Sequence, residues 1–462
     1  MSAARHAGYG LLAVLVLIVV LLAFFAWRVR HVATLPPQPA TSVAVSRLLT
    51  QPIADDVPDA EHVRRGQYLV REGDCLSCHL AAGGKPFAGG LGLNTPFGVI
   101  YSSNITSDRN AGIGAWTSDQ FYRAMHDGIG IHGERLYPAF PYPWFERASR
   151  ADDDAILAYL KTVPPVDSTP PPNRLPFPFN IRKTVAAWDL LFLHQKAFTP
   201  DPQQSAEWNR GAQIVNGLGH CGGCHTPKNT LGADKSSEMF WGADLDNHVA
   251  PDLTSNAHTG LGTWSVDEIV EYLKTGRNAR ANAGGPMADV ITYSTSLLND
   301  DDRHAIAVYL KSLPASDDES AKTPDPGAMK RGAEIYTDAC SACHLGNGVG
   351  QPGFFPPLGR NSVVQQRDPT GLLHILLAGS RTAPSPTRPS PLAMPSFAWK
   401  LSDAEIADVS TYLRNSWGNR ANDVSTKDVR DLREKLDLTT VHLTANSGDH
   451  DQAPVPTGNL NR

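Results

Sequence analysis

The sequence predicts an all-α protein in which three tandem helical domains follow an N-terminal transmembrane helix. Three observations lead to this prediction. The six cysteines form three C-x-x-C-H motifs. A short helical segment with a glycine precedes each motif, and a helix containing an aromatic-leucine pair closes each repeat. An uncharged, mostly apolar stretch near the start of the chain is long enough to cross a bilayer, which takes about 20 residues.

The uncharged stretch runs from Ala7 to Trp27 and has the core LLAVLVLIVVLLAFFAW. A cleaved signal peptide is the alternative interpretation. The stretch is long for a signal-peptide core, and no A-x-A site follows it before WRVRH. We therefore expect an uncleaved anchor. Its orientation is nearly undecided by charge, because Arg5 lies on one side and Arg28 and Arg30 lie on the other.

Composition narrows the function classes. At 462 residues the chain is long enough for about three domains. A hydrophobic content of 41% is typical of globular proteins, and 36 prolines with 39 glycines indicate many loops. The net charge of −6 argues against nucleic acid as a partner. No nucleotide, flavin or metal-hydrolase motif is visible in the sequence.

Within each repeat the sequence predicts two helices that cross closely. The first carries the glycine and the last carries a tyrosine, so a ring can rest on bare backbone. Capping boxes also predict where helices start. In a capping box, a hydroxyl and an acid or amide side chain satisfy free backbone N–H groups. The crossing glycines are Gly66, Gly211 and Gly332, and the capping boxes are Thr117-x-x-Gln120, Ser265-x-x-Glu268 and Ser402-x-x-Glu405.

The three motifs are CLSCH (75–79), CGGCH (221–225) and CSACH (340–344). This spacing is the attachment signature of c-type haem, because two thiols one helical turn apart can add to the two vinyl groups of one porphyrin. The next residue then offers an imidazole to the iron. A thioredoxin-like pair, half a zinc site and a disulfide framework are alternatives, but three copies that use every cysteine argue against them. The predicted thioether cysteines are Cys75, Cys78, Cys221, Cys224, Cys340 and Cys343, and the predicted proximal ligands are His79, His225 and His344.

Each repeat resembles a class I cytochrome c domain. The whole chain resembles the triple-haem cytochrome c subunits of membrane-bound bacterial dehydrogenases, such as those for alcohol, gluconate and aldehyde. The resemblance covers roughly residues 50 to 420 and rests on the three motifs, NITSD, GxGxW, YPAFPY, GPMA and MPSF. It implies three covalently bound haem c groups. It also implies a catalytic partner, which is a quinoprotein, a flavoprotein or a molybdenum enzyme.

The predicted domain boundaries follow the repeats and two linkers. The first linker contains VPPVDSTPPPNRLPFPF, which predicts a semi-rigid spacer, and an apolar helix that we expect to pack on a domain. The second linker is polar and acidic. The predicted segments are a membrane anchor and linker (1–48), domain 1 (49–163), a Pro-rich linker and helix (164–200), domain 2 (201–314), a linker (315–326), domain 3 (327–425) and a polar tail (426–462).

Methionine is the usual distal ligand of a cytochrome c iron. Met287 in GGPMA and Met394 in AMPSF lie beside proline in loops between helices, and we predict that they ligate the second and third irons. Phe140 occupies the matching position of the first repeat, because it follows His79 at nearly the spacing that separates Met287 from His225. A phenyl ring cannot ligate iron, so the first haem is predicted to differ from the other two.

Four alternatives remain for the sixth position of the first iron. Met125 aligns with buried helical positions of the other repeats, and His126 aligns with a solvated one. His132 lies in the loop that folds over the haem and is the best protein candidate. A vacant or weakly water-bound position is the fourth and preferred alternative.

The leading functional hypothesis is electron transfer from a partner dehydrogenase to ubiquinone or a terminal oxidase. The alternatives are a haem enzyme, peroxidase-like or reductase-like, that uses an open first site, and a haem sensor or storage module. Because haem c is attached outside the bacterial cytoplasm, we expect the chain after Trp27 to be periplasmic at the inner membrane. No catalytic residue of the chain's own is predicted.

Overall fold

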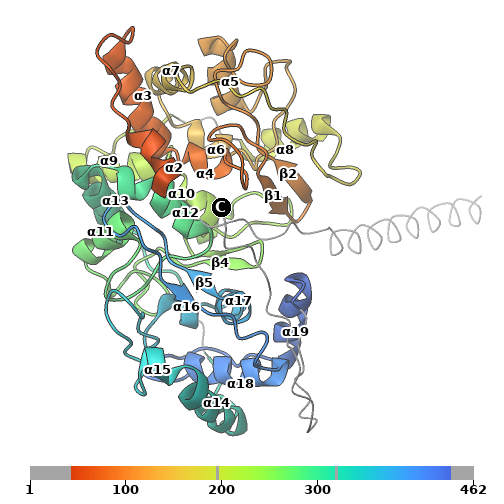
Figure 1. Ribbon diagram of the computed structural model, residues 1–462, viewed down its shortest axis with the longest axis vertical. Helices are drawn as coiled ribbons and strands as arrows, with labels where there is room; N and C mark the ends of the chain where they lie inside the picture. Colours follow the sequence, from red (N-terminus) through yellow and green to blue (C-terminus); the bar gives the residue numbers. More distant parts are fainter. Residues whose placement is uncertain (1–42, 194–196, 318–320, 439–462) are drawn as a thin grey trace, which may run out of the picture.

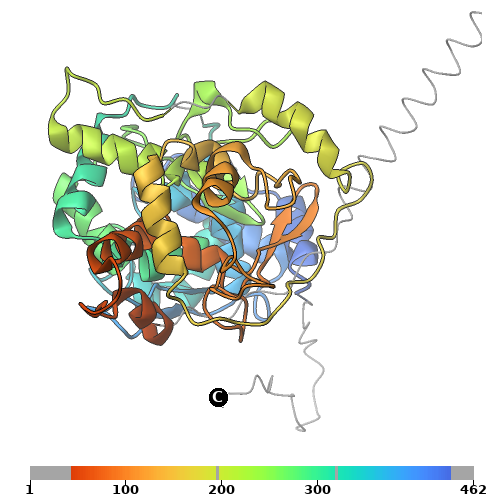
Figure 2. The ribbon, with the colours of Figure 1, turned by 90° about the horizontal axis from the view of Figure 1, so that it is seen from above.

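The computed structural model describes residues 43–193, 197–317 and 321–438. Three helical units follow one another down its long axis, coloured red to yellow, green and blue in Figure 1. Each unit is centred on one pair of crossing helices: α3 with α7, α9 with α13, and α14 with α18. The units pack directly against one another, and Figure 2 views them from above, down the long axis.

The glycine crossings predicted from the sequence are confirmed. A Cβ atom added at Gly66 would lie 1.8 Å from the carbonyl oxygen of Ala155, so only glycine lets the helices approach this closely. At Gly211 the same distance to Ala305 is 2.0 Å, with the Cβ atom of Tyr309 at 2.9 Å. The nearest group is therefore a backbone carbonyl, and the tyrosine lies beside it.

The predicted capping boxes are confirmed as well. Thr117, Ser265 and Ser402 each accept a hydrogen bond from the backbone N–H three residues on, and the residue there accepts one from the backbone of the cap. Thr117 and Ser265 fix where the first long helix after their cysteine motif begins, and Ser402 fixes the start of the last crossing helix of the third unit.

The first unit has its core around Leu69, Val70, Ile156 and Leu160. Asp74, which precedes the cysteine helix, has a left-handed backbone (φ 50°), and this turns the chain between the two helices. Its elements are α2 (Val43–Ser46), η1 (Arg47–Thr50), α3 (Ala60–Glu72), α4 (Cys75–Cys78), β1 (Gly92–Thr95), β2 (Gly98–Tyr101), α5 (Ser118–Asp127), α6 (Tyr142–Phe145) and α7 (Arg150–Leu160), and the linker to the second unit carries η2 (Arg182–Thr184) and α8 (Val185–Phe192).

The second unit repeats this plan. Its hairpin turns through Asp246 and Asn247, which both have positive φ, as a two-residue hairpin turn requires. Its elements are α9 (Ala206–Asn216), α10 (Cys221–His225), η3 (Ser236–Glu238), β3 (Ala243–Leu245), β4 (His248–Ala250), α11 (Val266–Thr275), α12 (Pro286–Tyr293), η4 (Thr295–Leu297) and α13 (Asp300–Ser312).

The third unit includes a helix that falls in the predicted polar tail. Val429 and Leu432 of α19 are buried in the core formed by α17 and α18. The elements of this unit are α14 (Pro326–Ala339), α15 (Ser341–His344), α16 (Ser362–Gln365), α17 (Thr370–Ala378), β5 (Ser380–Arg381), β6 (Ala393–Met394), α18 (Asp403–Arg414) and α19 (Thr426–Lys435).

The predicted fold class needs two corrections. The prediction of an all-α protein is wrong in detail, because the antiparallel strand pairs β1–β2, β3–β4 and β5–β6 accompany the helices. The N-terminal transmembrane helix is not upheld either. No described helix is long and apolar enough to span a membrane, since even α14 has only 14 residues where about 20 are needed. The predicted span, residues 7–27, lies outside the described residues.

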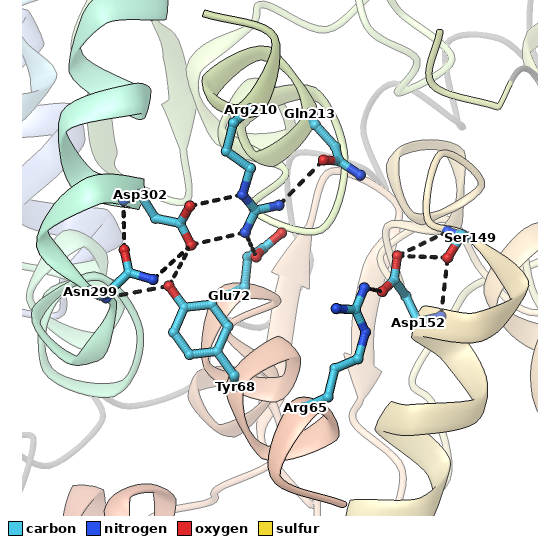
Figure 3. A network of polar contacts seen from close by, with 9 residues as sticks. All are labelled: Arg65, Tyr68, Glu72, Ser149, Asp152, Arg210, Gln213, Asn299 and Asp302. Atoms are coloured by element: carbon cyan, nitrogen blue, oxygen red, sulfur yellow. Dashed lines mark hydrogen bonds and ion pairs between the residues drawn. The ribbon is translucent and has the colours of Figure 1, made fainter. Parts of the chain in front are cut away.

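An ion-pair network joins the first unit to the second (Figure 3). Arg210 donates to Glu72 of the first unit at 2.6 Å and to Asp302 of its own unit at 2.8 Å. Tyr68 also donates to Asp302, at 2.5 Å. Burial raises the pKa of Glu72, and the guanidinium of Arg210 opposes this rise. The carboxylate of Glu72 therefore depends on Arg210 for its charge.

Different contacts join the second unit to the third. The backbone N–H of Ala383 donates to the carbonyl of Ala283 at 3.0 Å. The rings of His248 and His374 lie with their centroids 3.9 Å apart. Burial and the neighbouring His248 lower the pKa of His374 to about 4, and burial also lowers the pKa of His248. This interface therefore contains two uncharged imidazoles at neutral pH.

Candidate functional site

Each cysteine motif forms a single helical turn at the end of a longer helix. The turns are α4, α10 and α15, and they follow α3, α9 and α14. Each first cysteine is thereby held against the crossing helices of its own unit. All six thiols are free of disulfide bonds, so both thiols of each motif are available for another covalent partner.

The three histidines of the motifs share one orientation. The Nδ1 atom of His79 lies 2.6 Å from the carbonyl oxygen of Ser103, and that of His225 lies 2.6 Å from the carbonyl oxygen of Pro251. The corresponding distance from His344 to Pro356 is 3.1 Å. A carbonyl oxygen only accepts, so each Nδ1 carries the hydrogen and donates it. Each Nε2 atom is left with a lone pair.

Burial lowers the pKa of all three histidines. A neutral imidazole with a free Nε2 is the form that binds iron, and a hydrogen bond from Nδ1 fixes the ring. The thiols and the imidazoles of the three motifs therefore fit three haem c groups. A bare metal ion fits less well, since no group of three or more His, Cys, Asp or Glu side chains gathers to hold one in the described part of the chain.

The predicted distal methionines lie on different kinds of backbone. Met287 is in the first turn of α12 and packs against the core of the second unit. Met394 is on β6, whose partner across the ladder is Ser380. Both side chains are half-buried, as expected for thioethers that line a cofactor site. Their ligation of iron stays a prediction.

Phe140 lies in a different environment from the two methionines. Its ring lies 5.5 Å from that of Phe145 and 6.4 Å from that of Tyr142, and it packs on the core of the first unit. The backbone N–H of Phe140 donates to the carbonyl of Tyr137, which closes a tight turn before α6. An aromatic cluster therefore stands where the other two units have a thioether.

The structure separates the other candidates for the first site. Met125 is a core residue with 5% of its surface exposed. His126 is buried, with its Nε2 atom 2.8 Å from Asp153, so that nitrogen is already paired. His132 is exposed, and its backbone N–H donates to the carboxylate of Glu134. Of the three, only His132 has an exposed side chain.

The first two motifs lie side by side, which the sequence analysis did not predict. A Cβ atom at Gly222 would lie 2.2 Å from the indole of Trp144, a residue of the first unit. The glycine in CGGCH therefore makes room for the neighbouring domain. Burial raises the pKa of Cys78, and nearby groups that raise it further include Cys224 of the second motif. Helix α12 also contacts α4.

A buried carboxyl group, Asp74, lies at this junction. It accepts a hydrogen bond from the hydroxyl of Ser77 at 2.5 Å. Burial, with a smaller contribution from Asp289, raises the pKa of Asp74 to about 8. The two glycines of CGGCH were the one visible signal of this close packing, and nothing in the sequence pointed to Asp74.

A cytochrome c family model matches residues 209–314 and 329–417. The gluconate 2-dehydrogenase cytochrome c subunit of Pantoea cypripedii is 39% identical over 404 residues, which is 83% of this chain and 92% of that protein. The alcohol dehydrogenase (quinone) cytochrome c subunit of Gluconobacter oxydans is 40% identical over 399 residues, 81% of this chain and 83% of that protein.

A third relative is one of the nicotinate dehydrogenase subunits of Pseudomonas putida. It is 40% identical over 365 residues, which is 77% of this chain but only 30% of that longer protein. Two relatives above 35% identity that match over most of both chains, together with the family match and the motif geometry, agree on one assignment. The chain belongs to the cytochrome c family.

Proposed function

We propose that this protein carries electrons from a partner dehydrogenase to ubiquinone or a terminal oxidase, through three covalently bound haem c groups. The observation that carries the proposal is the threefold proximal geometry, in which each motif histidine donates from Nδ1 to a carbonyl and leaves Nε2 free. Haem c supplies a one-electron carrier when bound. The chain's residues supply attachment, orientation and the spacing between sites.

The residues divide these tasks. The cysteine pairs attach the cofactors, and the three histidines present a neutral nitrogen to each iron. Trp144 and Gly222 set how closely the first two motifs approach. The Arg210 network holds the first unit on the second, so this approach is fixed in one geometry.

The catalytic partner is proposed to be a quinoprotein, flavoprotein or molybdenum dehydrogenase. Support comes from relatives whose names describe cytochrome subunits of gluconate and alcohol dehydrogenases. The nicotinate dehydrogenase relative extends the range to a substrate with a nitrogen heterocycle. The proposed location is the periplasmic face of the bacterial inner membrane, because c-type haem is attached outside the cytoplasm.

A second candidate function is a haem enzyme that uses an open first site. It is favoured by one observation, the aromatic cluster around Phe140 at the place of a distal methionine. Turnover of peroxide by the purified protein, lost on replacing His79, would support it.

The test of the main proposal is purification of the protein from its native membranes with whatever binds it. We expect a dehydrogenase to co-purify, its substrate to reduce all three haems, and a ubiquinone analogue to reoxidise them. Isolation with no dehydrogenase, or haems that substrate reduces and neither quinone nor a terminal oxidase reoxidises, would overturn the proposal.

A further inference from the structure

The linker helix α8 leaves an apolar face uncovered. Leu190 is 86% exposed and Leu191 is 60% exposed, which is unusual for leucine. Ala186 and Ala187 are also exposed and lie three or four residues before the leucines, so all four share one side of the helix. We call Ala186, Ala187, Leu190 and Leu191 the α8 face. Helix α8 lies at the edge of the molecule in Figure 1.

The opposite side of α8 is fixed to the first unit. Val185 and Asp189 are buried, and the carboxylate of Asp189 accepts hydrogen bonds from Tyr142 at 2.5 Å and from Arg135 at 2.9 Å. The indole of Trp188 donates to the carbonyl of Leu231 at 2.9 Å. The helix is therefore docked, and the exposure of the α8 face does not result from a detached segment.

The charges around the α8 face have one sign. Lys183 is exposed and lies in η2, three and four residues before the alanines of the face. Arg174 and Arg182 are also exposed in the segment that leads to α8. Between residues 174 and 191 the only acid is Asp189, and it is turned inward. The chain as a whole is acidic, with a net charge of −6, so the net charge of this segment is opposite in sign to that of the whole chain.

We propose that the α8 face docks on an anionic phospholipid surface. Exposed leucines with flanking basic residues and no outward acid suit the boundary between acyl chains and negative headgroups. A protein interface of ordinary composition would instead combine aromatic residues with a polar rim. The exposed residues of α8 and of the turn before it, η2, are two leucines, two alanines, a threonine, an arginine and a lysine, which is closer to the lipid pattern.

The position of α8 gives this contact a consequence. Tyr142 and Arg135, which hold Asp189, flank the segment that contains Phe140. Arg182 also donates to the carbonyl of Arg135 and lies over the ring of Tyr137 at 4.9 Å. A bilayer on the α8 face therefore lies next to the distal segment of the first unit. This part of the inference rests on the proposed function, and it assigns the first motif to the end of the chain that faces a lipid-soluble acceptor.

The test uses the full-length holoprotein, in which the six native cysteines are consumed by haem attachment. Leu190→Cys introduces one reactive thiol on the α8 face, and Lys330→Cys introduces a matched thiol on the exposed side of α14 at the far end of the molecule. The rate of alkylation by an uncharged, water-soluble polyethylene glycol maleimide is measured by mass shift. It is measured with and without vesicles of phosphatidylethanolamine and phosphatidylglycerol.

Vesicles are expected to slow alkylation at position 190 at least tenfold and at position 330 less than twofold. Lys183→Glu in the Leu190→Cys background should remove most of the protection. Equal rates at position 190 with and without vesicles that hold the protein would overturn the proposal. Protection by a dehydrogenase and not by vesicles would also overturn it, in favour of a protein partner.

Haem content and reoxidation by a ubiquinone analogue are recorded on the same samples. Lost protection with intact quinone reduction overturns only the docking surface. Intact protection with haems that neither a ubiquinone analogue nor a terminal oxidase reoxidises overturns the proposed acceptor and leaves the docking surface standing.

Discussion

The first and second units share a proximal design and differ on the distal side. His79 and His225 each lie 2.6 Å from a backbone carbonyl, and Gly66 and Gly211 each allow the same helix crossing. The segment that should supply a distal ligand carries Phe140 in one unit and Met287 in the other. Repetition thus preserves what attaches and orients the cofactor, while the distal segment is free to change how that cofactor behaves.

Removing a cysteine pair is expected to have the largest effect on the first and second sites. The double variant Cys75→Ala, Cys78→Ala should lose one of three haems and with it the spectral features of the first site. Cys221→Ala, Cys224→Ala should lose the second haem in the same way, because each motif attaches its own group. Mass spectrometry and the haem content of the purified chain measure both. Retention of three covalent haems in either variant would contradict the account.

Exchanging the distal residues should interchange the two sites. Phe140→Met is expected to supply a thioether to the first iron and raise its reduction potential on the order of 100 mV, within the roughly 0.8 V range that axial ligands set. Met287→Phe should lower the second potential similarly. Potentiometric titration with optical detection resolves both shifts. Three overlapping methionine-type potentials in the unmodified protein would show that the sites do not differ.

The exposed histidine of the first unit provides a control for this exchange. His132→Ala should leave the spectrum and the potentials unchanged, because its side chain is exposed and its backbone is tied to Glu134. A change from low-spin to high-spin iron in that variant would instead identify His132 as the ligand.

Arg210 tests whether the contact between the first two units is energetically important. Arg210→Met leaves Glu72, a 3% exposed carboxylate, without its partner and should cost about 3 kcal/mol of unfolding free energy. Arg331→Met is the matched control. The guanidinium of Arg331 is 58% exposed in its pair with Asp408, so solvent screens that pair and its loss should cost far less. Denaturant unfolding measures both, and equal losses would refute the distinction.

A pH dependence of stability is expected at the other interface. The pKa of His374 is lowered to about 4, so the unfolded chain binds a proton that the folded chain cannot between about pH 6.5 and 4. Stability contributed by this site is present above pH 6.5 and is lost as the pH falls, by at most about 1.4 kcal/mol per unit. His374→Phe should flatten the acid side of a plot of melting temperature against pH.

Local patterns in the sequence predicted local structure well. The capping boxes at Thr117, Ser265 and Ser402 and the crossing at Gly66 depend on residues a few positions apart or on a repeated pair of helices. The cysteine motifs belong to the same class, because their chemistry is contained within five residues. The short hairpins were missed because strands of two to four residues leave no readable alternation.

Contacts between units could not be predicted. Arg210 and Glu72 are 138 residues apart, and no periodicity links them. The prolines of the first linker indicated a spacer, yet Trp144 of the first unit lies on Gly222 of the second. The apolar helix of that linker was expected to pack on a domain, and it does so through its buried side while Leu190 stays exposed. Such contacts depend on the shapes of whole units, which a single sequence does not reveal.

The first site is proposed to lack a strong sixth ligand, and the other two are proposed to have methionine. Carbon monoxide titration of the reduced holoprotein tests this proposal most directly. We expect one carbon monoxide bound per three haems in the unmodified protein, and none in the Phe140→Met variant. No binding by the unmodified protein, or equal binding before and after Phe140→Met, would contradict it.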